Sequence, residues 1–356
     1  MPADDAQSAS ERLKILMTAD AVGGVWQYSI DLVRHLVRGG AEVLLATMGP
    51  RPSEEKKSCL AALRGIKLCE SDYKLEWMEN PWADVDKAGA WLLDLAQDFR
   101  PDVIHLNGYA HAALPWRAPV LVVAHSCVYS WWKAVHNCAP PKDPWSEYHR
   151  RVSIGLRAAD AVVAPSRAMA DALSASYAFP AEWVRVIPNF SEAPAYAVVE
   201  KQHFFLAAGR AWDKGKNLQM LEQIAERLPW PVHIAGSLAR DAVIDEIQRA
   251  AVFAHPALYE PFGLAVLEAA RAQCCLVLAD IQSLTELWDG AAIFVDPQDP
   301  EAWVEALTKL AQDDLRRLAL GERARLHAAQ YSASLTVEQY RSLYQSLLNS
   351  RRGEAA

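Results

Sequence analysis

The sequence predicts an α/β fold made of two doubly wound units in series, each a parallel sheet covered by helices. Three observations support this expectation. Short apolar runs alternate with helical stretches along the chain, which is typical of parallel sheets. The 356 residues, 52% of them apolar, suffice for two domains of ordinary size. Residues 191–197 (SEAPAYA) separate two such series and indicate a linker.

The first series contains six expected strands with helices between them. Helices are expected, for example, over 25–38 and 86–99, and Gly39-Gly40 suits the end of the first of these. The expected strands are 13–18, 42–47, 102–106, 119–124, 161–164 and 184–187.

The second series contains five expected strands, and a final helix of about 334–348 follows a break at Tyr331-Ser332. Its strands are expected at 203–208, 231–235, 251–255, 275–279 and 291–295. Its helices are expected near 217–228, 239–250, 264–273, 300–311 and 314–330. We therefore expect one Rossmann-like domain from 1–192 plus 332–356, and a second from 193–331. Two such units imply a cleft lined by the carboxyl ends of strands.

Charge and composition exclude several classes of function. The net charge of −8, without a long basic run, disfavours nucleic acid as a partner and strong attachment to an acidic membrane. Residues 1–11 are polar, and no apolar run approaches the length of a membrane span, so we expect a cytoplasmic protein. The six cysteines show no CxxC spacing and are expected to be reduced and mostly structural.

The most informative segment, 259–268, reads YEPFGLAVLE and places two carboxylates on either side of a helix start. A proline and Gly263 interrupt any helix between Glu260 and Glu268, so Glu260 lies in a loop. The helix begins at Leu264, with Glu268 one turn inside it. Gly263 permits close backbone approach, and the N–H groups of the helix start suit a phosphate. Two solvated acids beside a core helix are the alternative interpretation.

A second glycine-rich turn, Gly23-Gly24, follows the first expected strand. Two glycines between strand and helix allow the backbone to approach a diphosphate. The turn is not GxGxxG, which disfavours a nicotinamide-dependent dehydrogenase. An ordinary strand-to-helix turn is the alternative.

Three further polar residues lie in or after expected strands. His125 directly follows the strand LVVA and should point into the cleft, unless it is a satisfied polar residue at a strand end. His105 lies inside a strand and is expected to be structural. Glu286 follows another strand end and either lines the site or caps a short helix.

Two cations, Arg210 and Lys216, lie at the carboxyl end of a strand and at a helix start, where they suit a diphosphate. A solvated basic turn is the alternative, and Lys214 between them is expected to be more exposed. An aromatic cluster follows His125 and could stack on carbohydrate, pack in the core or form a hydrophobic acceptor lip. It comprises Tyr129, Trp131, Trp132, Trp145 and Tyr148.

Together these residues resemble the retaining GT-B glycosyltransferases of family 4, over nearly the whole chain from Leu13 to about Leu348. The order and spacing of the motifs carry the resemblance. The matching pieces are Gly23-Gly24, His125, AVVAPS at 161–166, VIPNF at 186–190, GRAWDKGKN at 209–217, and the pair Glu260 and Glu268.

The resemblance implies a role for each candidate residue. Arg210 and Lys216 would hold the donor diphosphate, while His125 and Glu260 would contact the transferred sugar; these four take the catalytic positions. Glu268 would bind the ribose hydroxyls. Backbone groups would complete the donor site, from Gly23, Gly24, Phe262, Gly263 and Leu264.

The function implied is transfer of a hexose from a nucleoside-diphosphate sugar to an acceptor hydroxyl with retained anomeric configuration. The donor would be a UDP-hexose or GDP-mannose, and the acceptor a saccharide or lipid-linked saccharide. No metal or other cofactor is expected. The first domain would bind the acceptor, the second would bind the donor, and the last helix would pack back on the first. A GT-B epimerase or phosphorylase, or a non-catalytic protein that binds nucleotide sugars, remains an alternative.

Two departures from the family pattern stand out. Between Ala235-Gly236 and Ala251 the family usually has a further helix and strand, whereas 237–250 supplies one connection. The absent strand would be the outer one, leaving 231–235 at the sheet edge. Because the family often grips the nucleobase there, base recognition is open. The second departure is Gln273-Cys274, where the family commonly has a glycine.

Overall fold

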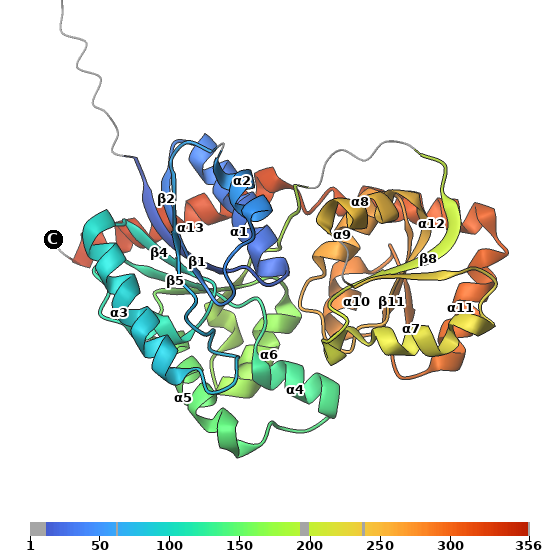
Figure 1. The fold of residues 1–356 in the computed structure, drawn as a ribbon, viewed down its shortest axis with the longest axis horizontal. Coiled ribbons are helices and arrows are strands. Elements are labelled where there is room, and N and C mark those ends of the chain that lie inside the picture. Colours follow the sequence, from blue (N-terminus) through green and yellow to red (C-terminus); the bar gives the residue numbers. More distant parts are fainter. Residues whose placement is uncertain (1–11, 62, 193–198, 237–238, 355–356) are drawn as a thin grey trace, which may run out of the picture.

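Two parallel sheets, each flanked by helices, form the protein in the computed structural model, which describes residues 12–61, 63–192, 199–236 and 239–354. Figure 1 shows the two units side by side, with the last helix returning to the first. The α/β prediction is confirmed. Expectations for 1–11 and for 193–197 of the linker lie outside the described residues, and the exact domain limits stay a prediction.

The first sheet has seven strands in the order β3-β2-β1-β4-β5-β6-β7. All six expected strands are present. β3 was not expected, because its residues are mostly only partly buried and the strand lies at the sheet edge. The strands are β1 (Lys14–Asp20), β2 (Glu42–Met48), β3 (Ile66–Glu70), β4 (Val103–Leu106), β5 (Val120–Val123), β6 (Ala161–Ala164) and β7 (Val184–Val186).

Six α-helices connect these strands among the described residues. The helix predicted over 25–38 is confirmed, and Gly40, with φ of +90°, follows its end as expected. The aromatic segment after His125 folds into two helices, α4 and α5, which the sequence did not predict. The helices are α1 (Gly24–Arg38), α2 (Glu54–Ala61), α3 (Trp82–Phe99), α4 (Val128–His136), α5 (Lys142–Ala158) and α6 (Arg167–Tyr177).

The second sheet has five strands in the order β12-β11-β10-β8-β9, so β9 lies at the edge as expected. Its strands are β8 (Gln202–Ala208), β9 (Val232–Ala235), β10 (Ala250–His255), β11 (Cys275–Ala279) and β12 (Ile293–Val295). Its helices are α7 (Leu218–Ile224), α8 (Arg240–Arg249), α9 (Leu264–Arg271), α10 (Gln282–Trp288), α11 (Pro300–Ala311) and α12 (Asp314–Ala328). Leaving residues 237–238 aside, α8 is the one helix between β9 and β10.

The last helix, α13 (Ala333–Glu354), packs on the first sheet, as the sequence predicted, and is longer than expected. Its buried Tyr340 and Tyr344 share a core cluster with Ile15 and Met17 of β1. The helix thus ties the chain's end to the strand with which the described part begins. No described helix is long and apolar enough to cross a membrane.

Candidate active site

Parallel strands bring their carboxyl ends to one edge of each sheet, and the candidate residues gather at these ends. β1 leads into the Gly23-Gly24 turn, β8 into Arg210, and β10 into the loop that carries Glu260. Gly23 has φ of +78°, and a Cβ at this position would lie 3.1 Å from Nη1 of Arg210. A Cβ on Gly24 would lie 3.6 Å from Leu264. The glycine turn of the first unit therefore faces a cation and a helix start of the second.

Glu260 and Lys216 form an ion pair with an Nζ–Oε2 distance of 2.5 Å. The same Oε2 lies 3.0 Å from Nε2 of His255, a buried residue at the end of β10. Burial alone would raise the pKa of Glu260, but the charge of Lys216 and the hydrogen bond with His255 hold that pKa well below its usual range. Glu260 is therefore an ionised carboxylate at neutral pH, anchored through one oxygen.

Arg210 is held by a partner that the sequence analysis did not single out. Its Nη2 lies 2.8 Å from Oδ2 of Asp213, and the indole N–H of Trp131 donates to Oδ1 of Asp213 at 3.0 Å. The guanidinium also lies 4.8 Å above the ring of Trp212. Since Trp131 belongs to α4, the first unit contributes to the geometry of the cation.

His125 is fixed in one orientation and one charge state. Asn107 donates its amide N–H groups to the Thr18 carbonyl at 2.7 Å and to Ser29 at 3.2 Å, which leaves Oδ1 of Asn107 as an acceptor. This Oδ1 lies 2.8 Å from Nε2 of His125, so Nε2 carries the proton. Burial lowers the pKa of His125 to about 3. The ring is therefore neutral, with Nδ1 as a hydrogen-bond acceptor.

The start of α9 presents backbone and not side chains. The side chain of Phe262 is buried in the core of the second unit, where its ring lies edge-on to that of Tyr331 with 5.5 Å between the ring centroids. Only the backbone of Phe262 is therefore available to a ligand. Gly263 adopts the left-handed conformation, with φ of +87°, immediately before α9. The predicted loop and helix start are confirmed, and the free N–H groups of a helix start favour anions.

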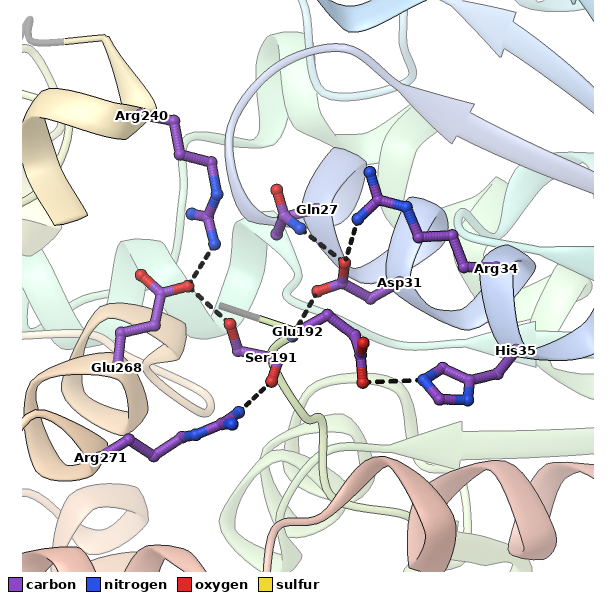
Figure 2. A network of polar contacts seen from close by, with 9 residues as sticks. All are labelled: Gln27, Asp31, Arg34, His35, Ser191, Glu192, Arg240, Glu268 and Arg271. Carbon is purple, nitrogen blue, oxygen red and sulfur yellow. Dashed lines mark hydrogen bonds and ion pairs between the residues drawn. The ribbon is translucent and has the colours of Figure 1, made fainter. Parts of the chain in front are cut away.

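Glu268 lies one turn into α9 and is 2% exposed. Its Oε1 accepts a hydrogen bond from Ser191 at 2.8 Å and pairs with Arg240 at 2.6 Å (Figure 2). The carboxylate proposed for ribose is thus already oriented by two protein partners, neither of which the sequence analysis named.

Glu286 caps a helix of the opposite unit. Its two carboxylate oxygens accept the backbone N–H groups of Arg167 and Ala168, both at 2.7 Å, at the start of α6. Of the two readings, capping is the one that the structure supports, and the capped helix is not its own. Nearby, Tyr259 lies 2.8 Å from the hydroxyl of Ser130, so further contacts join the units.

The remaining residues that the sequence analysis named lie partly in the core and partly at the surface. His105 is buried and hydrogen-bonded to Tyr344 at 2.7 Å, which confirms a structural role. Lys214 is exposed, as expected. Tyr148 is buried in the first core and Trp145 packs against it, whereas Trp131 reaches the second unit. All six cysteines are free.

The signals for the missed residues were partly visible in the chain. Asp213 lies inside the GRAWDKGKN segment, between the two predicted cations, and His255 ends a strand just as His125 follows one. Ser191 and Arg240 carried no such local signal, because their partner Glu268 is distant in sequence. Trp131 was named in the aromatic cluster, but its contact with Asp213 was not predicted.

Comparison with known families decides the assignment. Residues 22–191 match the model of Glycosyltransferase Family 4, and residues 186–327 match that of Glycosyl transferases group 1. The two models meet where the structure passes from β7 toward the second sheet. The chain belongs to the group 1 glycosyltransferases of family 4. It is thus a member of a family of transferase enzymes.

Curated relatives of this glycosyltransferase align over part of their length. A D-inositol 3-phosphate glycosyltransferase of Corynebacterium urealyticum is 37% identical over 131 residues, 36% of this chain and 31% of the relative. An N,N'-diacetylbacillosaminyl-diphospho-undecaprenol alpha-1,3-N-acetylgalactosaminyltransferase of Campylobacter jejuni is 25% identical over 47% of this chain and 43% of the relative. The chain therefore spans less than half the length of these relatives.

Solved structures establish the GT-B fold of this glycosyltransferase. A sucrose-phosphate synthase from Thermosynechococcus elongatus superposes with a TM-score of 0.80 at 16% identity, covering 95% of this chain and all of the other. HepE of Anabaena, in complex with UDP and glucose, superposes with a TM-score of 0.72 at 15% identity, covering 94% of this chain and all of the other. At these identities the likeness shows the fold alone.

Proposed function

We propose that the protein transfers a hexose from a nucleoside-diphosphate sugar to an acceptor hydroxyl, with retained configuration and without a metal. The observation that carries the proposal is the approach of Arg210 to the Gly23-Gly24 turn: a Cβ added to Gly23 would lie 3.1 Å from Nη1 of Arg210. A cation, a glycine turn and the start of α9 here converge from both units. All three are groups that favour a diphosphate.

Charge stabilisation of the leaving group is the main chemical task. When the anomeric bond breaks, negative charge grows on the diphosphate. Arg210, held by Asp213, and Lys216 would stabilise that charge together with the helix start. Lys216 now pairs with Glu260, so the bound donor would share this cation with the carboxylate. Two side-chain cations fill the role of Mg²⁺, which is why we propose that no metal is needed.

The transferred sugar would be held by Glu260 and His125. Glu260 is ionised and anchored through Oε2, so Oε1 would accept hydrogen bonds from sugar hydroxyls. The acceptor atom Nδ1 of His125 suits a further hydroxyl. A glycosidase mechanism would need a second carboxylate opposite Glu260 across the glycosidic bond. Glu268 does not fit that role, because its carboxylate is bound to Ser191 and Arg240.

Retention would follow from displacement on one face of the sugar. The acceptor oxygen would bond to the anomeric carbon as the bond to the phosphate oxygen breaks. The acceptor's proton would pass to that leaving phosphate oxygen, so no protein base is required. This expectation rests on the family resemblance and on the contacts of Glu268 with Ser191 and Arg240.

We propose that residues 193–331 bind the donor and that 1–192 with 332–356 bind the acceptor. UDP-hexose is the first donor candidate, since HepE is a structural neighbour in complex with UDP and glucose, and GDP-mannose is the second. A saccharide or a lipid-linked saccharide is the proposed acceptor, and the Campylobacter relative, whose name contains diphospho-undecaprenol, supports the lipid-linked form.

The test is turnover with matched variants. Lys216→Ala or Glu260→Gln should lower kcat at least 10²–10³-fold, the usual cost of removing one preorganised contact to developing charge. Lys214→Ala is the control, because Lys214 is an exposed cation in the same turn and should leave turnover unchanged. Wild-type rates in both site variants would contradict the assignment. NMR should show a product with the donor's anomeric configuration, whereas a stereoisomer formed without acceptor would indicate an epimerase.

A further inference from the structure

The proposed ribose carboxylate, Glu268, belongs to a network that joins the two units (Figure 2). Its side chain is 3% exposed, whereas that of Arg240 is 38% exposed. Ser191 and Arg240 both contact Oε1, and neither contact drawn in Figure 2 involves Oε2. A buried carboxylate requires a charged or hydrogen-bonding partner, so these two contacts determine how the carboxylate is oriented.

Arg240 lies between carboxylates of both units. It is the first residue of α8, and its charge acts on Asp31 of α1 as well as on Glu268. Asp31 is fully buried, and burial raises its pKa, while Gln27, the backbone N–H of Glu192 and the charges of Arg240 and Arg34 oppose that rise. Arg240 is therefore an electrostatic link between helix α1, which follows the glycine turn, and helix α9.

Ser191 and Glu192, which precede the second sheet, are hydrogen-bonded within the same network. The backbone N–H of Glu192 donates to Asp31 at 3.1 Å, and the Glu192 carboxylate lies 2.8 Å from Nε2 of His35. Arg271 donates to the backbone carbonyl of Ser191. The orientation of Glu268 is thus built from side chains of α1, α8 and α9 and from the connecting segment.

We propose that Arg240 is a positioning residue that orients Glu268 toward the donor ribose and thereby sets a preference for ribonucleotide over 2′-deoxyribonucleotide donors. The inference rests on the proposed function. An ionised carboxylate accepts hydrogen bonds from hydroxyl groups strongly, and a site built for a hydroxyl rejects the analogue that lacks it. Arg240 stands in the shortened connection between β9 and β10, so it ties recognition of the nucleoside to the part of the chain that departs from the family pattern.

The experiment measures dissociation constants by calorimetry for UDP, GDP and ADP and for their 2′-deoxy counterparts. The proteins are wild type, Arg240→Ala, Arg240→Lys and Arg249→Ala. Arg249 is the matched control, because it lies at the other end of α8 in an exposed pair with Glu246. Glu268→Gln serves as the reference for loss of the carboxylate. A melting curve for each protein separates unfolding from a specific effect.

For the preferred base, wild type and Arg249→Ala should favour the ribonucleotide roughly 10- to 100-fold, as expected for a hydrogen bond to a charged group. Arg240→Ala should lower this ratio to within about threefold of unity, close to that of Glu268→Gln. Arg240→Lys keeps the charge but loses the guanidinium geometry, so its ratio of affinities should lie between those of wild type and Arg240→Ala. This variant preserves the test if Arg240→Ala does not fold.

Calorimetric results that differ from these expectations would each overturn a specific claim. An unchanged ribose preference in both folded Arg240 variants, or a larger one, would overturn the positioning role and leave the proposed function intact. Equal wild-type affinity for both sugars would overturn the positioning role together with the ribose assignment of Glu268, while donor binding would stand. Failure of wild type to bind any of the three nucleotides would overturn the proposed function itself.

Discussion

The indole N–H of Trp131 in the first unit donates to Asp213 of the second at 3.0 Å, and Asp213 in turn holds Arg210 at 2.8 Å. Arg210, the cation proposed to bind the donor, is therefore positioned partly from across the interface between the units. If the units separate, this hydrogen bond breaks. Docking of the first unit would then complete the proposed diphosphate site, as expected where closure assembles a catalytic site.

Trp131→Phe should weaken catalysis without unfolding the protein. The change removes the N–H donor but keeps an aromatic ring, and a hydrogen bond to a charged group is worth about 1.5–3 kcal/mol. We expect kcat/KM to fall roughly 10-fold or more. Trp132→Phe is the matched control, because the neighbouring indole N–H has no hydrogen-bond partner among the described residues. Equal rates for the two variants would contradict the relay through Asp213.

The protonation state of His125 gives a spectroscopic prediction. Because its pKa is lowered to about 3, the ring should stay neutral from pH 5 to pH 8. Nitrogen-detected NMR of histidine side chains should show the proton on Nε2, since Asn107 accepts it there. Asn107→Leu removes that acceptor and should lower kcat. A ring that titrates near its usual pKa, or a proton on Nδ1 in the wild type, would refute this account.

Asp20 predicts a defined pH dependence of stability. Its carboxyl lies at the end of β1, and burial raises its pKa from 3.8 to about 6 although Val22, Arg210 and Lys56 oppose the rise. Between these values the native state binds more protons than the unfolded state, so the free energy of unfolding falls as pH rises through this window. The contribution is on the order of 2 kcal/mol.

The check for Asp20 is a difference measurement. Denaturant unfolding of wild type and Asp20→Asn is compared between pH 4 and pH 7, and the asparagine variant should lose this part of the slope. Since other carboxyl groups titrate equally in both proteins, the difference isolates Asp20. If the difference in free energy of unfolding between the two proteins stays constant from pH 4 to pH 7, the Asp20 carboxyl has an ordinary pKa.

Glu286 predicts a modest loss of stability when its cap on α6 is removed. Glu286→Ala should lower the free energy of unfolding by about 1 kcal/mol, the usual value of a helix N-cap. Glu305→Ala removes an exposed carboxylate paired with Lys309 on α11 and should cost less. Urea titration measures both. An equal effect would mean that the contact across the interface adds nothing to stability.

Much of the fold could be predicted because parallel strands are continuous apolar runs. Even the edge position of β9 followed from the short connection at 237–250. β3 was missed because its burial is incomplete and, with Lys67 inside a strand of five residues, it contains no continuous apolar run. The helices α4 and α5 were not predicted, because the aromatic residues of this segment were considered as a cluster and not as helices. Of the alternatives for that cluster, core packing holds for Tyr148, which is buried.

In the candidate site too, some residues could be predicted from the sequence and others could not. Gly263, Arg210 and Glu260 were recognisable from strand ends, glycines and helix starts, which are local signals. The partners that orient them come from distant parts of the chain: Trp131 is 82 residues from Asp213, and Ser191 is 77 residues from Glu268. Only the packing of one unit against the other brings such pairs together.

The most direct test of the central claim is a thermal-shift panel of UDP, GDP, ADP and TDP with their common sugar conjugates, without metal, on wild type and Lys216→Ala. A ligand at ~100 times its dissociation constant stabilises the native state by about 2.7 kcal/mol. We predict that one base stabilises the wild type clearly and the variant far less. No shift with any nucleotide, or the same shift in both proteins, would contradict a diphosphate site built on Arg210 and Lys216.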